Sequence, residues 1–369
     1  MKFICDKNEL SEALTNVSKA VSDKASINSL ENIKFELSGN SLCLTGYDLE
    51  LGIRTSLSVT TADTGAFLGS ARLFCEMVRK MPDGQISVTL DENMMLTIQG
   101  GLTSYNMNAL SADDYPELPG KESAEPISVP QSVLKSMIVQ TKFAASLLDI
   151  KPILKGELFE IGDGQIVLAA IDGYRLAVRY EPIGCQENVK FVVPAKNLDE
   201  ISKLLSDDDD CVCNMFLAKN HIIFEIGSYL VSSRLLEGEF HPYKSAIPVA
   251  HNTEVIVDRA PLINALERCM LLISEKNPSP VRCIFDNNEL KIKCRTSSVG
   301  KVHDEIDVKM TGSPIEIGFK CRYFIDPLKV ISDEKVKLQM GGNLQPMKIV
   351  PVEGDKFIYL VLPVRLPKE

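Results

Sequence analysis

The sequence lacks any apolar run that approaches the roughly 18 residues of a membrane-spanning helix. It also lacks an apolar leader, because Met1-Lys2-Phe3 passes directly into a strand pattern. We therefore expect a cytoplasmic protein whose ten cysteines are reduced and mostly buried in its core. With 45% hydrophobic and 24% charged residues, the chain has the composition of an ordinary folded protein.

Recognisable catalytic and metal-binding motifs are missing as well. No phosphate-binding loop of the G-x-x-x-x-G-K-[ST] type occurs, and no histidine pair has the spacing of a zinc helix. The close pair Cys211 and Cys213 is weak evidence for a metal, and the run Asp207 to Asp210 is more typical of a solvated loop. The sequence therefore predicts no catalytic residue, no metal and no cofactor.

The clearest pattern that is present is a threefold repeat of charged residues. A base, an acid four residues later and a second base three beyond it recur at intervals of 124 and 126 residues. Repeats of this length are domain-sized and too long for solenoid units. The three copies are Arg72, Glu76 and Arg79; Lys196, Glu200 and Lys203; and Arg322, Asp326 and Lys329.

Each copy opens with a short strand that leads into a helix, at Asp6, Pro130 or Asp258, where a cap or a first-turn proline fits. Paired apolar runs with hairpin-type turns follow, and the charged helix then leads into further strands. We predict an α+β fold of three similar domains, each with two helices packed on antiparallel sheet. The domains are expected at residues 1–124, 125–251 and 252–369.

Charge differs between the predicted helices and the rest of the chain. Segments 70–81, 130–148 and 319–332 each carry +2, and the other three predicted helices are neutral. The net charge of −10 therefore leaves −16 outside the helices. Because residues seven apart on a helix differ by only about 20° in azimuth, the two bases of each copy share a face. This basic face on an acidic body is typical of a surface that follows a polyanion.

A simpler explanation remains open for each helix by itself. The intervening acid can form ion pairs that only solvate the helix, worth about 0.2–0.5 kcal/mol each. This does not explain why three modules share the face, or why Lys135 and Lys142 have no acid on theirs. Pro327 lies inside the last charged helix and is expected to kink it or displace its start.

Several short motifs, in order and at matching spacing, resemble one family along essentially the whole chain. They are Met1-Lys2-Phe3, Leu44-Thr45-Gly46-Tyr47-Asp48-Leu49-Glu50, Asp172-Gly173-Tyr174-Arg175-Leu176-Ala177, Gly238-Glu239-Phe240 before Tyr243, and Leu362-Pro363-Val364-Arg365-Leu366. This combination resembles the bacterial DNA polymerase III β subunit family, the sliding clamps. The resemblance implies a non-enzymatic DNA clamp fold that closes as a head-to-tail homodimeric ring of six domains.

In that family duplex DNA passes through the ring and meets basic residues without base readout, so that the ring can slide. The resemblance carries this role to Lys24, Arg72, Arg79, Lys151, Lys196 and Lys203. The chain departs from the family pattern near these positions, where better-known clamps often have polar, aromatic or basic residues. The departures are Leu148, Pro152, Ile153 and Ala195.

The resemblance also implies a cleft between the second and third domains that binds short linear peptides of the polymerase, the clamp loader and repair factors. The matching residues are Leu154, Ile171, Gly173, Tyr174, Arg175, Leu176, His241, Ala246, Leu360, Val361, Leu362, Pro363, Val364 and Arg365. Without the resemblance, the same tail would be interpreted as an ordinary core strand. Two departures, His241-Pro242 and Pro367-Lys368-Glu369, fall at the edge of this cleft.

Ring closure in the family pairs the first domain of one chain with the third domain of the other. The matching residues are Tyr105 and Met107 on an edge strand, opposite Leu271 and Leu272. Two other classes of function remain open at this point. One is an enzyme with a site around Asp172, Arg175 and the acids near Asp207, and the other is an interaction scaffold whose basic helices serve only solubility.

Overall fold

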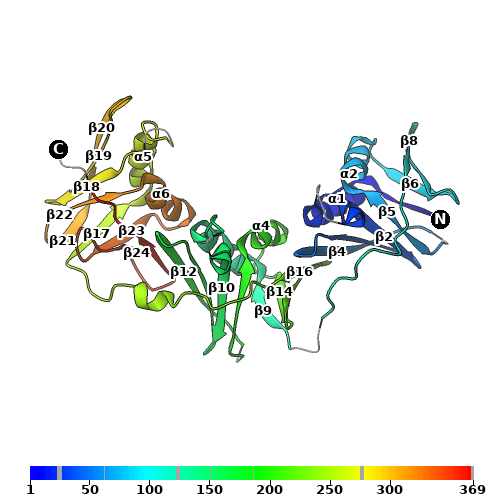
Figure 1. Cartoon of the computed structure of the whole chain (residues 1–369), viewed down its shortest axis with the longest axis horizontal. Coiled ribbons are helices and arrows are strands. Elements are labelled where there is room, and N and C mark those ends of the chain that lie inside the picture. The colour runs from blue at the N-terminus through cyan, green and yellow to red at the C-terminus, as the bar shows by residue number, and fades with distance from the viewer. Residues whose placement is uncertain are drawn as a thin grey trace. The chain divides into compact units, whose positions relative to one another are not determined.

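The computed structural model describes residues 1–22, 27–61, 63–121, 125–149, 151–185, 187–274 and 278–366. The chain divides into two compact units (Figure 1). One consists of residues 1–134 and 200–235, and the other of residues 135–199 and 236–369. Each unit has the same plan, with one long antiparallel sheet, one four-stranded antiparallel sheet and a pair of helices.

The first unit contains an eight-stranded sheet with the order β5-β2-β3-β4-β16-β15-β14-β9. In chain order these strands are β2 (Asn32–Ser38), β3 (Ser41–Tyr47), β4 (Leu51–Ser58), β5 (Gly65–Ser70), β9 (Ile127–Pro130), β14 (Val212–Leu217), β15 (His221–Ile226) and β16 (Tyr229–Arg234). Its smaller sheet has the order β1-β6-β7-β8, with β1 (Lys2–Asp6), β6 (Gln85–Leu90), β7 (Met95–Gly100) and β8 (Thr103–Asn108). Strand β8 therefore lies at a sheet edge.

Helices α1 (Lys7–Val17) and α2 (Ala71–Lys80) lie side by side in this unit (Figure 1). The predicted cap at Asp6 is confirmed, because its carboxylate accepts hydrogen bonds from the backbone of Asn8 and Glu9 at 2.8 and 3.2 Å. Helix α1 buries Leu10 and Leu14 and contacts both sheets. The face of α2 that carries Arg72, Glu76 and Arg79 is exposed to solvent.

The second unit contains a nine-stranded sheet with the order β13-β10-β11-β12-β25-β24-β23-β17-β21. In chain order these strands are β10 (Gly156–Gly162), β11 (Gln165–Ile171), β12 (Arg175–Pro182), β13 (Val189–Pro194), β17 (Thr253–Asp258), β21 (Lys309–Gly312), β23 (Lys335–Met340), β24 (Met347–Pro351) and β25 (Phe357–Val361). The smaller sheet has the order β20-β19-β18-β22, with β18 (Val281–Asp286), β19 (Glu289–Thr296), β20 (Gly300–Asp307) and β22 (Ile315–Phe319). Helices α5 (Arg259–Met270) and α6 (Cys321–Val330) pack together on this unit.

The remaining helices come from the central repeat, whose residues are shared between the two units. They are α3 (Gln131–Thr141) and α4 (Ala195–Leu204). Short 3-10 helices complete the described secondary structure, namely η1 (Ser18–Ala20), η2 (Asn28–Glu31), η3 (Lys142–Ala144), η4 (Pro152–Lys155) and η5 (Tyr243–Ala246). The three repeats of the sequence are thus joined by continuous sheets.

The predicted hairpins are confirmed. Strands β2 and β3, β10 and β11, and β18 and β19 pair in antiparallel register across two-residue turns. Both residues of the turn Asp163-Gly164 have positive φ, as have both of Asn287-Asn288. That geometry matches the right-handed twist of the flanking strands and explains the Asn, Asp and Gly composition of these turns.

Two local predictions are wrong, and a third is wrong in one of its two alternatives. Helix α3 ends at Thr141, so Lys142 lies in η3 and does not continue the helical face of Lys135. Asp258 precedes α5 but makes no capping bond; one oxygen of its carboxylate pairs with Lys335 at 3.2 Å. Of the two effects expected of Pro327, a displaced start of α6 does not occur, because the helix begins six residues earlier at Cys321. The other effect, a kink at Pro327, stays a prediction.

All ten cysteines are free thiols, and six of them are buried. Burial raises the pKa of the Cys5 and Cys269 thiols to about 12, which keeps them protonated. Within the described ranges, no helix is long and apolar enough to cross a membrane. The same residues contain no group of three or more histidines, cysteines or acids that could hold a metal ion.

Candidate functional site

The base-acid-base pattern forms an exposed face on three helices, as predicted. Arg72 and Arg79 of α2, Lys196 and Lys203 of α4, and Arg322 and Lys329 of α6 are all exposed. On α2 and α4 the acid pairs with the second base, Glu76 with Arg79 at 2.6 Å and Glu200 with Lys203 at 2.8 Å. Arg72 and Lys196 form no ion pair with any residue that the structure describes.

Lys142 differs from the other predicted bases. The sequence predicted a face without an acid at Lys135 and Lys142, but Lys142 forms an ion pair with Asp199 of α4. That acid lies 57 residues away in the chain and was not visible to a pattern confined to one helix. Lys142 is therefore partly neutralised, and it is not a free member of a basic face.

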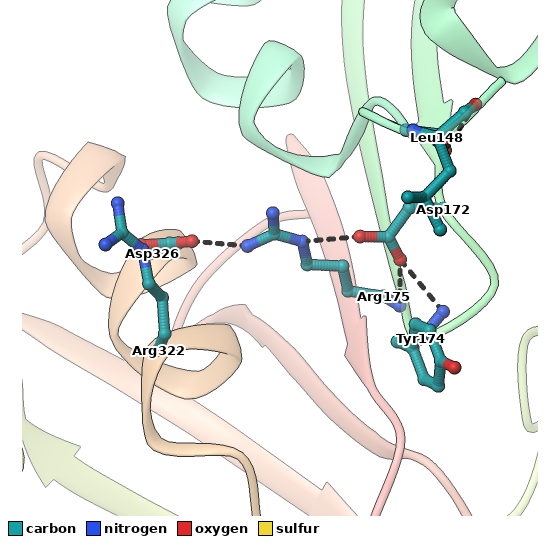
Figure 2. Close-up of polar contacts among 7 residues, drawn as sticks. Leu148, Asp172, Tyr174, Arg175, Arg322 and Asp326 are labelled. Carbon is teal, nitrogen blue, oxygen red and sulfur yellow. Dashed lines mark hydrogen bonds and ion pairs between the residues drawn. The ribbon is translucent and has the colours of Figure 1, made fainter. Parts of the chain in front are cut away.

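The third helix uses its acid differently. Asp326 of α6 accepts a hydrogen bond from Arg175, which begins β12, and lies 3.8 Å from the guanidinium of Arg322. Figure 2 shows Arg175 extended between two carboxylates, that of Asp326 and that of Asp172, to which its Nε donates at 3.0 Å. Asp172 also accepts the backbone N–H groups of Tyr174 and Arg175. A single arginine thus links the β11–β12 turn to α6.

Aromatic rings surround this arginine. The guanidinium carbon of Arg175 lies 4.7 Å from the ring centroid of Tyr323 and 5.6 Å from that of Phe143. Tyr323 stacks on Tyr174 with centroids 5.8 Å apart, and the ammonium of Lys320 lies over both rings. Cation–π contacts of this kind contribute about 0.5–2 kcal/mol each, according to exposure. The stack keeps Tyr174, which is 49% exposed, in a defined position at the surface.

The chain after β25 lies against the same turn. The backbone N–H of Leu362 donates to the carbonyl of Tyr174 at 2.9 Å, and that of Val364 donates to Gly318 of β22 at 2.8 Å. Leu362 and Tyr174 are two of the exposed large hydrophobic residues. We call this set, Tyr174, Arg175, Leu362, Pro363 and Val364, the tail surface.

An apolar cluster lies on the nine-stranded sheet, and several of its residues adjoin the tail surface in the sequence. Ile171, Leu176 and Leu360 pack there with the buried Tyr243, and Leu154 lies against them half-buried. The carboxylate of Glu160 accepts from the hydroxyl of Tyr243 at 2.7 Å and pairs with Lys190 and Lys244. These contacts fasten the segment that carries His241 and Ala246 to the sheet.

The pKa of Glu160 reflects those partners. Burial by itself would raise this pKa, but hydrogen bonds from Lys190, Lys244 and Tyr243 outweigh it and lower the pKa to about 2. The carboxylate therefore remains charged over the physiological range. Its bonds to η5 persist wherever the protein is folded at neutral pH.

Models of the DNA polymerase III beta subunit match residues 1–119 with the N-terminal domain, 128–242 with the central domain and 244–365 with the C-terminal domain. The chain belongs to the DNA polymerase III beta subunit family. Members of this family are sliding clamps, and they are not catalytic.

Relatives of this family match over their full length. The beta sliding clamp of Halalkalibacterium halodurans is 31% identical over 379 residues, covering 99% of this chain and 100% of the relative. The crystal structure of the Bacillus subtilis DNA polymerase sliding clamp superimposes with a TM-score of 0.96 at 30% identity, covering all of both chains. A putative DNA polymerase III beta subunit from Eubacterium rectale gives 0.94 at 34% identity, covering 99% of each chain.

The clamp residues expected at DNA are distributed over both units. Arg72, Arg79 and Lys203 belong to the first unit, and Lys151 and Lys196 to the second; all five are exposed. Lys24 lies outside the described residues, as do Pro367, Lys368 and Glu369. Of the departures from the clamp pattern, Leu148 is exposed, and Ala195 packs against the core of the second unit.

All fourteen residues expected at the clamp's peptide cleft lie in the second unit, but they do not all reach the surface. The side chain of Val361 is 0% exposed and belongs to the unit's main core. Ile171, Leu176 and Leu360 are buried in the apolar cluster. The residues open to a partner are, in part or fully, Leu154, Gly173, Tyr174, Arg175, His241, Ala246, Leu362, Pro363, Val364 and Arg365.

The residues expected at the clamp's dimer interface have contrasting exposures. Leu271, directly after α5, is 82% exposed, and Leu272 is half-buried. Tyr105 is half-buried on the edge strand β8, while Met107 on the same strand is buried within its own unit. An exposed leucine and an unpaired strand edge are features that a partner surface can cover.

Sequence reasoning missed Lys320, Tyr323 and Phe143, which hold Tyr174 and Arg175 in place. A signal was available for Tyr323. Tyr323 and Asp326 are three residues apart on α6 and therefore project on one face of the helix. Nothing in the sequence linked that face to Arg175, which lies about 150 residues earlier, so the contact needed the tertiary structure.

Proposed function

We propose that the protein is the processivity clamp of its replicase, a homodimeric ring that encircles duplex DNA and tethers the DNA polymerase. The observation that carries this proposal is the exposed basic face on α2, α4 and α6 in a chain whose net charge is −10. Lysines and arginines that meet phosphates through solvent give affinity without sequence preference. The acids Glu76 and Glu200 temper that attraction, which favours sliding over tight binding.

In this proposal the DNA-facing residues are Lys24, Arg72, Arg79, Lys151, Lys196 and Lys203. The ring closes through Tyr105 and Met107 of one chain against Leu271 and Leu272 of the other. The domains extend over residues 1–124, 125–251 and 252–369, and the protein acts in the cytoplasm without a cofactor or metal.

The tail surface is the proposed site for partner peptides. Tyr174 and Leu362 offer exposed apolar area, and Arg175, fixed by Asp172 and Asp326, offers a polar contact at the rim. Short linear peptides bind such sites through a few apolar anchors. The polymerase, the clamp loader and repair or replication factors would share it.

Encirclement of DNA is tested by comparing retention of the clamp on circular DNA, which has no free ends, and on linear DNA. Clamp loaded by its loader should stay on nicked circular DNA and leave the same DNA after linearisation. Equal retention on both substrates would exclude encirclement.

Replacing Arg72 and Lys196 with glutamine should reduce the salt dependence of DNA binding. The slope of the logarithm of the binding constant against the logarithm of the salt concentration should fall by about one for each phosphate that is no longer neutralised.

The peptide site is tested with Leu362→Asp, since Leu362 is exposed and Val361 is core. Binding of a peptide from the polymerase should be abolished while the dimer is preserved. Leu344→Asp is a matched control, because Leu344 is also exposed and lies outside the tail surface. Equal peptide affinity in both variants would exclude the assignment.

A further inference from the structure

A lysine that lies outside the repeated charge pattern is close to the basic face of α4. Lys19 belongs to η1, the short helix that follows α1, and it is half-buried. Burial lowers the pKa of Lys19, the charge of Glu200 on α4 opposes that shift, and the charge of Lys203 adds to it. Lys19, Glu200 and Lys203 all belong to the first unit. The fold therefore brings a base from the first repeat beside a helix of the central repeat.

Two hydrogen bonds hold Lys19 in this position. Its Nζ donates to Oδ1 of Asn16 at 3.0 Å, and Nδ2 of Asn16 donates to the hydroxyl oxygen of Tyr229 at 2.9 Å. Because an ammonium group can only donate, the amide of Asn16 must turn its oxygen toward Lys19 and its NH2 group toward Tyr229. Asn16 lies on α1, and Tyr229 begins β16. The lysine is thus fixed by a link between two repeats.

The charge of Lys19 is not neutralised within the described part of the chain. Lys19 forms no ion pair there, and its contact with Asn16 uses one of three N–H donors. The nearby acid, Glu200, already pairs with Lys203 at 2.8 Å. A half-buried cation beside a second cation costs free energy, because it loses water and is repelled. An anion that meets both ammonium groups would reduce that cost.

We propose that Lys19 is a further residue that contacts the DNA backbone, next to Lys203, and that Asn16 positions it. This inference rests on the proposed clamp function, in which Lys203 meets DNA and Lys19 has no assigned role. An ammonium group is a point charge that binds phosphate without a fixed geometry. Such a contact carries no base readout and can pass from one phosphate to the next, as a sliding ring requires.

A structural role at the end of α1 is the alternative explanation. A cation just beyond the last turn of a helix interacts favourably with the partial negative charge there. Helix α1 ends at Val17, two residues before Lys19. That role predicts a loss of stability when Lys19 is replaced, and no change in how DNA binding depends on salt. The two explanations therefore differ in a measurable quantity.

The test measures the anisotropy of a fluorescein-labelled DNA duplex with the full-length protein over a range of salt concentrations. Lys19→Gln should make the slope of the logarithm of the binding constant against the logarithm of the salt concentration less steep by about 0.9, the value for one phosphate. Affinity at low salt should fall about fivefold. The control Lys219→Gln removes the same charge from an exposed position between β14 and β15, and it should leave the slope unchanged.

Asn16→Asp tests the positioning role without removing a base. The new carboxylate would lie where the amide oxygen now accepts from Lys19, so it should pair with the ammonium group and weaken DNA binding about as much as Lys19→Gln. Asn220→Asp, at an exposed position, is the matched control for the added negative charge and should change affinity by less than about twofold. Thermal unfolding of each variant checks that the fold is retained.

Three results would overturn the inference. A slope like that of the parent in Lys19→Gln would leave only the structural role, and an equal change in Lys219→Gln would show an effect of net charge. Undiminished binding by Asn16→Asp would show that Lys19 does not meet DNA from the position that Asn16 gives it. Absence of salt-dependent binding by the parent would overturn the clamp function itself, whereas the other results leave that function intact.

Discussion

Helices α2 and α6 carry the same base-acid-base spacing, but their acids have different partners. On α2, Glu76 is exposed and pairs with Arg79 of its own helix. On α6, Asp326 is mostly buried and bonds to Arg175 from a distant strand. The comparison shows that one sequence pattern can produce a solvated face in one module and a structural link in another.

Solvent exposure explains the difference in energy. An exposed i,i+3 pair such as Glu76 and Arg79 contributes about 0.2–0.5 kcal/mol, because water screens both charges. Arg175 is only 11% exposed and has two carboxylate partners, so its charge relies on them for solvation. Removing one partner from such a group is costly. Glu157 is a third and more extreme case than Glu76 and Asp326. It is fully buried, and no ion pair to it is found among the described residues.

Arg175→Ala should have the largest effect on stability. It leaves Asp172 and Asp326 without their shared cation and should lower the free energy of unfolding by about 3 kcal/mol. Urea denaturation of the variant against the parent measures this change. Arg322→Ala is the control, because Arg322 is exposed and 3.8 Å from Asp326, and it should cost less than about 0.5 kcal/mol. Equal losses of stability in both variants would show that the contacts of Arg175 are no stronger than those of an exposed arginine.

Asp326→Asn keeps the shape of the acid and removes its charge. We expect a loss of about 1.5 kcal/mol, which is typical of a hydrogen bond to a charged group. The peptide affinity of the tail surface should also fall, because Arg175 loses one of the two groups that orient it. Asp172→Asn provides the comparison for the other side of Arg175, and calorimetry with the same peptide reports both. If Asp326→Asn has the parent's stability and peptide affinity, the contact between Asp326 and Arg175 contributes no more than an exposed ion pair.

Glu157 should make stability depend on pH. Burial raises its pKa from 4.5 to about 8, only partly opposed by the hydrogen bond with Thr141 and the charge of Lys142. Thr141 contacts the Met137 carbonyl at 2.8 Å, so its single hydroxyl hydrogen can serve that bond while a protonated Glu157 donates to Thr141. The folded state thus holds a proton that the unfolded state releases above pH 4.5.

Because the folded state binds this proton more tightly than the unfolded state, Glu157 stabilises the fold more at low pH than at high pH. Stability from Glu157 is complete below about pH 4.5 and is lost as pH rises toward 8, at about 1.4 kcal/mol per pH unit. Glu157→Gln should remove this slope between pH 6 and 7, measured by denaturation at each pH. Glu160→Gln is the contrast, because that carboxylate is already ionised through the window. An unchanged slope in Glu157→Gln would contradict a protonated Glu157.

Glu76→Gln should have the smallest effect on stability. Loss of one exposed ion pair should change the free energy of unfolding by about 0.3 kcal/mol. The same change leaves Arg72 and Arg79 unopposed, so binding to duplex DNA should become tighter and more dependent on salt. Anisotropy with a labelled duplex at several salt concentrations checks this. Weaker DNA binding would show that Glu76 positions Arg79 instead of tempering it.

Much of the fold followed from local pattern. The apolar periods, the turn residues at Asp163-Gly164 and Asn287-Asn288, and the cap at Asp6 act within a few residues, so the sequence predicted the paired strands and six helices. The exceptions were the ends of elements, such as Thr141 and Asp258. At Asp258, a neighbour from elsewhere in the chain, Lys335, pairs with the carboxylate that the local pattern assigned to the helix cap.

The candidate site was less predictable from the residues themselves. The exposed bases of α2 and α4 were found because a helical period fixes their face. The full burial of Val361 was not predicted, because an apolar strand end looks the same in the sequence whether it faces a core or a partner peptide. Lys142 was taken as unopposed because its acid, Asp199, lies on another helix.

The sequence by itself determined the threefold repeat, the family of the chain and the segregation of positive charge onto helices, since each depends on residue identity and short-range spacing. The tertiary structure alone decided how that charge is used. It left Glu76 with its own helix and brought Asp326 to Arg175. Burial and long-range pairing set the energy of a charge, and neither is encoded in the spacing of residues along one element.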